Sequence, residues 1–183
     1  MGSEQQETQK RMVKIWSYDG VVVEVPEAVA IQSVVIKHVV EDVGVEDPIP
    51  TPNVVGDVLS KVFEYCTKHA EFDATTAAAA AVKSGPNDEP AAAAAAAAAM
   101  EKMENWDRQF INLPLDTLHD VLNAADYLEI QGLLDLCLDK VASAITQKTA
   151  EEIRRDFNIQ NDFTPEEEEA VRREHSWAHH DAD

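Results

Sequence analysis

The hydrophobic periodicity of this chain stops over Ala70–Met103, and this interruption constrains the fold more than any other feature. Two alanine blocks, Ala74–Ala81 and Ala91–Ala99, flank a break that contains glycine, prolines and charged residues. Alanine is the best helix former, so each block is compatible with transient helix. An alanine-only face, however, buries too little apolar area to offset the entropy of ordering. We therefore expect residues 70–104 to be a mobile insertion between two halves of one domain.

The first half begins with a predicted hairpin. Met12–Ser17 alternates between apolar and polar residues, and Val21–Val25 is rich in valine. Asp19-Gly20 between these two runs is a strong hairpin signal.

Two helices should follow, joined by an extended connector. Apolar residues at helical spacing run from Ser33 to Gly44 and again over 54–69, where they form one clear stripe. Between them, 47–52 holds three prolines, which predicts a rigid, extended connector.

After the insertion, order should resume at Trp106. Phe110–Leu113 is interpreted as a short strand, Asp116 as the cap of a helix, and a further helix should follow Gly132. With two or three short strands and several helices, the predicted fold class is α+β and helix-rich.

The C-terminal lobe carries more apolar surface than it can bury. Two capping boxes, Thr149 with Glu152 and Thr164 with Glu167, predict two short helices. Such a lobe cannot build a closed core alone, so its large side chains must pack against the preceding helix, a partner, or both. The large apolar residues concerned are Ile153, Phe157, Ile159, Phe163, Val171 and Trp177. A tryptophan this close to the chain end is a typical interface anchor.

Composition excludes several classes of partner. A net charge of −20 argues against binding to nucleic acid or to an anionic membrane surface. The N-terminal residues 1–11 are polar, lack the apolar core of a secretory signal and should be disordered. Cys66 and Cys137 lie in apolar helical patterns, which favours buried free thiols and a reducing compartment.

A search for catalytic or metal-binding motifs finds little. The sequence has no phosphate-binding glycine loop, nucleophile elbow or paired Cys-x-x-Cys. Cys66 and His69 have the i,i+3 spacing of a helix, which would allow a thiolate–imidazole pair. The favoured interpretation is nevertheless a core cysteine beside an exposed histidine. His175, His179 and His180 stand on an acidic tail, where a specific metal site is not expected. We predict no enzymatic activity and no cofactor.

Several motifs, in the same order, resemble those of the S-phase kinase-associated (Skp) adaptors. The longest is Ile-Arg-Arg-Asp-Phe-Asn-Ile-Gln-Asn-Asp-Phe-Thr-Pro-Glu-Glu-Glu-Glu, at 153–169. The other matching segments are Ser17–Gly20, Ile49–Val54, Glu64–His69, Asn123–Asp135 and Arg173–Trp177. The resemblance implies a BTB-type domain over residues 12–145 and a two-helix C-terminal extension over 146–183. It also implies an adaptor that couples F-box proteins to a cullin in an SCF ubiquitin ligase in the nucleus and cytoplasm, with an alanine-rich insertion like that of plant members.

The resemblance further implies two groups of binding residues. Asp126 and Tyr127 fall where the family meets the N-terminal region of the cullin. The residues on the F-box side are Val141, Ile145, Ile153, Phe157, Ile159 and Trp177.

The sequence also departs from the family pattern. Asp126 replaces an asparagine and Thr51 a leucine, while Gln147 and Ala150 replace glycine and proline, and His175-Ser176 replaces Asn-Gln. These changes bear more on cullin affinity than on the fold. An alternative therefore stays open, in which the chain is a homo-oligomeric BTB scaffold that works outside any ligase. Self-association of the free chain through an exposed F-box-binding surface is open as well.

Overall fold

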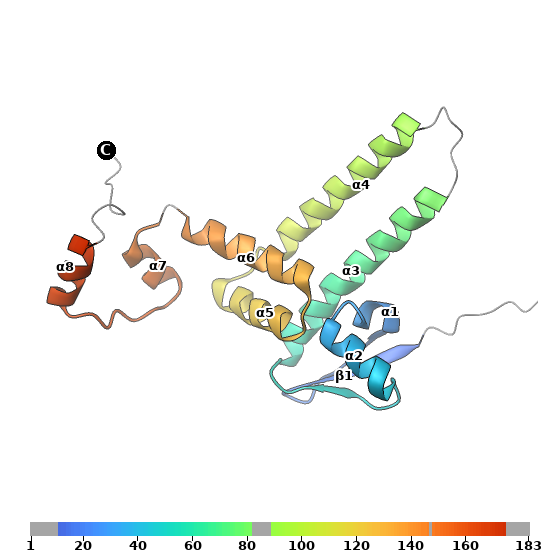
Figure 1. The fold of residues 1–183 in the computed structure, drawn as a ribbon, viewed down its shortest axis with the longest axis horizontal. Helices are drawn as coiled ribbons and strands as arrows, with labels where there is room; N and C mark the ends of the chain where they lie inside the picture. Colours follow the sequence, from blue (N-terminus) through green and yellow to red (C-terminus); the bar gives the residue numbers. More distant parts are fainter. Residues whose placement is uncertain (1–10, 82–88, 147, 175–183) are drawn as a thin grey trace, which may run out of the picture. The chain divides into compact units, whose positions relative to one another are not determined.

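The computed structural model describes residues 11–81, 89–146 and 148–174. The chain divides into two compact units, residues 1–144 and 145–183, which are described separately below (Figure 1). The predicted disordered N-terminus, the break of the insertion at 82–88, Gln147 and the tail with Trp177 lie outside the described residues. The described part contains no helix that is long and apolar enough to cross a membrane.

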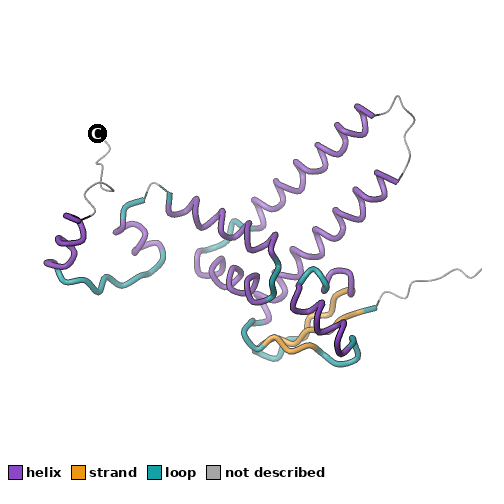
Figure 2. Tube along the Cα trace, in the orientation of Figure 1, coloured by secondary structure: helices purple, strands orange, loops and turns teal. Residues whose placement is uncertain are grey.

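A three-stranded sheet forms one side of the first unit. Strand β1 (Met12–Ser17) pairs antiparallel with β2 (Val22–Pro26) and parallel with β3 (Ile49–Thr51), in the order β2-β1-β3 (Figure 2). Residues of β1 alternate between exposed and buried, so that helices cover one face of the sheet. The predicted hairpin is confirmed. In its turn Gly20 has a φ of 83°, a left-handed conformation that favours glycine.

The predicted proline-rich connector is extended, and part of it joins the sheet. Ile49 faces the core and Pro50 is exposed. Proline is tolerated here because β3 is a short strand at the edge of the sheet, where not every backbone N–H is needed for strand pairing.

Helices from both halves of the first unit build a single core. Helix α1 (Glu27–Ala30) and α2 (Val34–Val43) follow the hairpin, α3 (Gly56–Ala81) follows β3, and α5 (Leu115–Tyr127) and α6 (Gln131–Ile145) complete the unit. The largest fully buried side chains are Phe63, Ile15, Ile36, Leu59, Leu118, Leu128 and Leu133. Since these residues come from the sheet, from α2 and α3 and from the segment after the insertion, both halves belong to one domain.

The alanine-rich segment is more helical than the sequence predicts. Helix α3 continues past His69 to Ala81, and α4 spans Glu89–Phe110, so that two long helices lie alongside each other (Figure 1). The high helix propensity of alanine accounts for this extension, since each block continues a helix that is already nucleated in the packed domain. The mobility of residues 70–104 stays a prediction.

Two local predictions after the insertion are wrong. Phe110–Leu113 is not a strand, because α4 continues to Phe110 and buries that ring against Tyr65 and Trp106. Asp116 does not cap α5. Pro114 occupies the cap position, and Asp116 lies in the first turn, where its carboxylate interacts favourably with the positive end of the helix dipole.

The second unit contains two short helices. Helix α7 spans Ala150–Asp156 and α8 spans Pro165–Glu174. Both predicted capping boxes are confirmed: the Thr149 hydroxyl accepts from the Glu152 N–H, and the Thr164 hydroxyl from the Glu167 N–H.

Candidate functional site

The candidate cullin residues lie at the C-terminal end of α5. Glu129, with a φ of 51°, ends this helix in a Schellman motif. Its N–H donates to the Asp126 carbonyl at 3.0 Å, and the Ile130 N–H donates to the Ala125 carbonyl at 2.9 Å. These bonds fix the backbone so that the Asp126 side chain is exposed and that of Tyr127 is half-buried against the core.

Ser33 ties this helix end to a distant part of the domain. Its buried hydroxyl donates to the Leu128 carbonyl at 2.6 Å and accepts from the Ile36 N–H at 3.2 Å, where it caps α2. One side chain therefore satisfies groups at the ends of two helices, which makes the backbone around Tyr127 rigid.

Thr51, one of the departures from the family pattern, is accommodated inside the domain. Its side chain is buried, and its hydroxyl donates to the Trp16 carbonyl at 3.0 Å. The polar group is thus satisfied within the sheet and is not presented to a partner.

The second unit has no core of its own among the described residues 148–174. No residue of α7 or α8 is buried. Ile159 is 54% exposed and Phe163 is 47% exposed, while Ile153 and Phe157 are half-buried. The sequence did not decide whether Ile153 and Phe163 pack within the chain, and neither side chain is buried in the structure. Large apolar side chains on a surface of this kind are typical of a protein-binding site.

The end of α7 gathers three of the predicted F-box residues. Asn158, with a φ of 53°, ends the helix in a second Schellman motif, in which the Ile159 N–H donates to the Arg154 carbonyl at 2.7 Å. This motif returns the chain toward the preceding turn and favours contact between the residue after the cap and the last apolar residues of the helix. We refer to Ile153, Phe157 and Ile159, which come from this helix end, as the apolar cluster.

Ion pairs and caps hold this unit together instead of a core. Arg154 lies 3.2 Å from Glu168, and Arg172 lies 3.3 Å from Glu151. In each capping box the backbone N–H of the threonine donates to the glutamate carboxylate, and this lowers the pKa of Glu152 and of Glu167. The helices of the unit are thus stabilised mainly by local polar contacts.

The remaining predicted F-box residues lie on α6 or in the tail. Val141 is half-buried against the core of the first unit, and Ile145 at the end of α6 is 40% exposed. Trp177 lies outside the described residues. Leu138 on the same helix is also exposed, although no role was predicted for it. Its spacing of seven from Ile145 places both residues on one face of α6.

The two cysteines are buried and unpaired, as predicted. Burial raises the pKa of Cys66 to about 12 and that of Cys137 to about 11, which makes both thiols inert. His69 is not the exposed residue that the sequence suggests. Its Nε2 lies 2.9 Å from Asp107 Oδ1, and its ring lies 4.0 Å from that of Tyr65. The described residues include no cluster of ligands that could hold a metal ion.

Comparison with known proteins identifies the family. Residues 11–71 match the tetramerisation domain of the Skp1 family, and residues 131–178 match its dimerisation domain. The chain is 56% identical to SKP1-like protein 1 of Oryza sativa subsp. japonica, over 94% of this chain and 97% of that protein. It is 46% identical to SKP1-like protein 11 of Arabidopsis thaliana, over 92% and 97% of the two chains. It is also 41% identical to the S-phase kinase-associated protein 1 homolog of Tetrahymena thermophila, over 91% and 93%. The chain therefore belongs to the Skp1 family of SCF adaptors, which link F-box proteins to a cullin.

Proposed function

We propose that this adaptor performs no chemistry itself and binds its two partners through separate surfaces. Asp126 and Tyr127 contact the N-terminal region of the cullin. The F-box covers apolar residues of α6 and of the C-terminal segment, namely Val141, Ile145, Ile153, Phe157, Ile159 and Trp177. The adaptor then supplies proximity, because it fixes the distance between a bound substrate and the transfer machinery of other subunits.

The observation that carries this proposal is the lack of buried residues in α7 and α8. A stable packed unit of this length would enclose its isoleucines and phenylalanines, yet here they are half-buried or exposed. A second polypeptide that covers them would remove this apolar area from water, and this burial would stabilise the complex by roughly 25 cal/mol for each Å².

The test is a titration of the full chain with a purified F-box protein. Phe157→Ala should weaken binding by roughly 2–4 kcal/mol, the range of a buried interface anchor. Trp177→Ala should fall in the same range. Gln160→Ala is the matched control, since this exposed polar residue lies one position beyond the cluster, and it should leave the affinity unchanged. Equal affinities for the wild-type chain and the Phe157 and Trp177 variants would refute the assignment.

The same surface accounts for self-association of the free chain, which we propose as a competing state. An F-box protein should then dissociate the oligomer, because both interactions use the apolar cluster. The two buried free thiols support a reducing compartment, and we place the adaptor in the nucleus and cytoplasm.

A further inference from the structure

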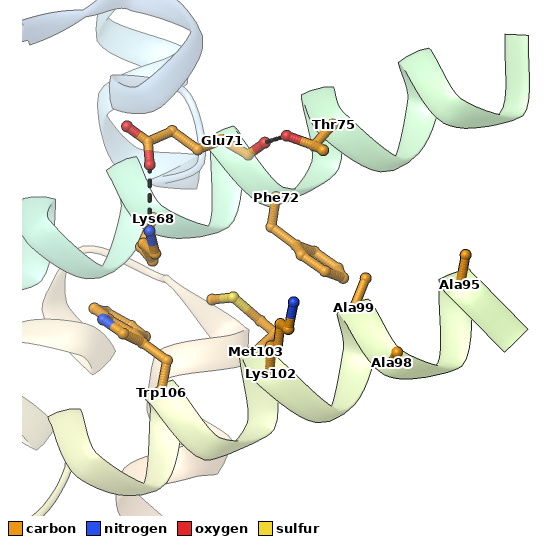
Figure 3. A pocket seen from close by; sticks show the side chains of 10 residues that line it. All are labelled: Lys68, Glu71, Phe72, Thr75, Ala95, Ala98, Ala99, Lys102, Met103 and Trp106. Carbon is orange, nitrogen blue, oxygen red and sulfur yellow. Dashed lines mark hydrogen bonds and ion pairs between the residues drawn. The ribbon is translucent and has the colours of Figure 1, made fainter. Parts of the chain in front are cut away.

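The two long helices of the first unit enclose an apolar groove that neither proposed surface includes. The stripe Lys68, Glu71, Phe72 and Thr75 on α3 faces the stripe Ala95–Trp106 on α4 across a cavity of about 570 Å³ (Figure 3). Both stripes have helical spacing, so each presents one continuous face to the cavity. We call this cavity the α3–α4 groove.

The groove is closed by large side chains at one end and lined by small ones at the other. Trp106 lies at the end near the domain core with Met103 next to it, Phe72 reaches toward Ala99 in the middle, and Ala95 and Ala98 line the outer part (Figure 3). The alanines of α4 are too short to fill the space opposite Phe72 and Thr75 of α3, and a void in an apolar layer loses dispersion contacts. The lining on α4 runs from Ala95 to Trp106, eleven steps along the helix, which corresponds to roughly 16 Å at 1.5 Å per residue. An elongated groove of this length fits about three turns of a helix.

The charge at the groove differs from that of the whole chain. Lys68 and Lys102 line it, and the only carboxylate among the lining residues is that of Glu71, which lies 3.5 Å from the Lys68 ammonium. The Lys102 ammonium is directed toward the cavity (Figure 3). A local positive charge therefore lies beside an apolar surface, in a chain of net charge −20.

We propose that the α3–α4 groove binds an amphipathic helix of a partner protein that carries large apolar residues on one face and a carboxylate at its edge. The apolar residues fill the alanine-lined part of the groove, and the carboxylate pairs with Lys102. This is the helix-in-groove mode of recognition. A second copy of this chain fits less well, because a symmetric contact between two such grooves would bring Lys102 of one copy close to Lys102 of the other. The groove contains none of the proposed F-box or cullin residues, so this inference is independent of the proposed function.

The probe is a pair of labelled helical peptides of about fifteen residues, long enough to span the groove. Both carry leucine at positions i, i+3, i+4 and i+7, and their edges carry either glutamate or lysine. Anisotropy titrations with the full chain should show that the glutamate-edged peptide binds more tightly. Lys102→Glu should weaken that peptide about fivefold and strengthen the lysine-edged one. Lys37→Glu on α2 changes the net charge by the same amount away from the groove, and it should leave both affinities within about twofold.

A second variant tests the shape of the groove. Ala98→Leu fills it from an exposed helix position where leucine is a good helix former, and it should weaken the glutamate-edged peptide roughly tenfold. Equal binding of the two peptides, or equal effects of Lys102→Glu and Lys37→Glu, would overturn the proposal. So would displacement of the peptide by laurate, which would assign the groove to a small amphiphile. A dimer that Ala98→Leu dissociates in sedimentation equilibrium would assign it to a second copy.

Discussion

Replacement of Ser33 by alanine should reveal how strongly one hydroxyl stabilises the domain. The Ser33 side chain is 0% exposed, donates to the Leu128 carbonyl at 2.6 Å and accepts from the Ile36 N–H at 3.2 Å. Loss of a serine cap costs about 1 kcal/mol. Removal of the donor to a buried carbonyl costs a further ~1–3 kcal/mol. We therefore expect Ser33→Ala to lower the free energy of unfolding by about 2–4 kcal/mol.

Urea unfolding of the full chain at neutral pH, followed by circular dichroism, measures this difference. Thr149→Ala is the matched control, because it also removes a helix cap but at an exposed position. With no buried carbonyl deprived of its donor, the control should cost about 1 kcal/mol or less. The excess of the Ser33 effect over the Thr149 effect then estimates the contribution of the bond to Leu128.

A loss below about 1 kcal/mol for Ser33→Ala would contradict this reasoning. It would mean that water enters the site and replaces the serine hydroxyl, so that the end of α5 is not held rigidly by the distant helix. The same result would remove the structural argument for a preformed surface at Asp126 and Tyr127.

Three further outcomes follow from the structure. Asp126→Asn should raise the affinity for a cullin N-terminal fragment by roughly 1–3 kcal/mol, because it restores an amide donor at an exposed position. Titration measures this difference, and an unchanged affinity would show that Asp126 is not part of the cullin-binding surface. Glu129→Gly should raise the free energy of unfolding in urea by about 0.5–1 kcal/mol, since glycine adopts a φ of 51° without strain; a loss of stability would argue against the left-handed cap. The lowered pKa values of Glu152 and Glu167 stabilise the folded unit above the ordinary carboxyl pKa of 4.5, and this stabilisation should be lost as pH falls through the lowered values. Amide chemical shifts of α7 and α8 followed against pH would show this, and a transition above about pH 6 would contradict it.

Local signals in the sequence were sufficient for much of the fold. The hairpin at Asp19-Gly20, the helix that begins after Ser33 and both capping boxes each depend on a few neighbouring residues, and the structure contains all of them. One of the errors arose where a distant residue decides the structure. Phe110 continues α4 because its ring packs against Tyr65, which lies far away in the sequence.

The geometry around the candidate site residues could not be predicted from the sequence. Both Schellman motifs use residues other than glycine, Glu129 and Asn158, so the usual sequence signal for a helix end was missing at the first and weak at the second. The bond between Ser33 and Leu128 joins positions 95 residues apart, and no local pattern reveals such a pair. The family resemblance names the candidate binding residues, whereas the local conformations at the ends of α5 and α7 come from the structure alone.

The two proposed surfaces differ in how they are prepared for binding. Asp126 and Tyr127 stand on a helix end that backbone bonds and a buried serine already fix, so cullin binding requires little ordering there. Helices α7 and α8 contain no buried residue, and they must lose conformational freedom when an F-box covers them. Its ion pairs between Arg154 and Glu168 and between Arg172 and Glu151 are internal. The energy of F-box binding must then come chiefly from buried apolar area, which depends on shape more than on particular charges. If both proposed surfaces are correct, such an adaptor should accept many F-box sequences of similar apolar pattern, while the proposed cullin contact should stay sensitive to a single residue such as Asp126.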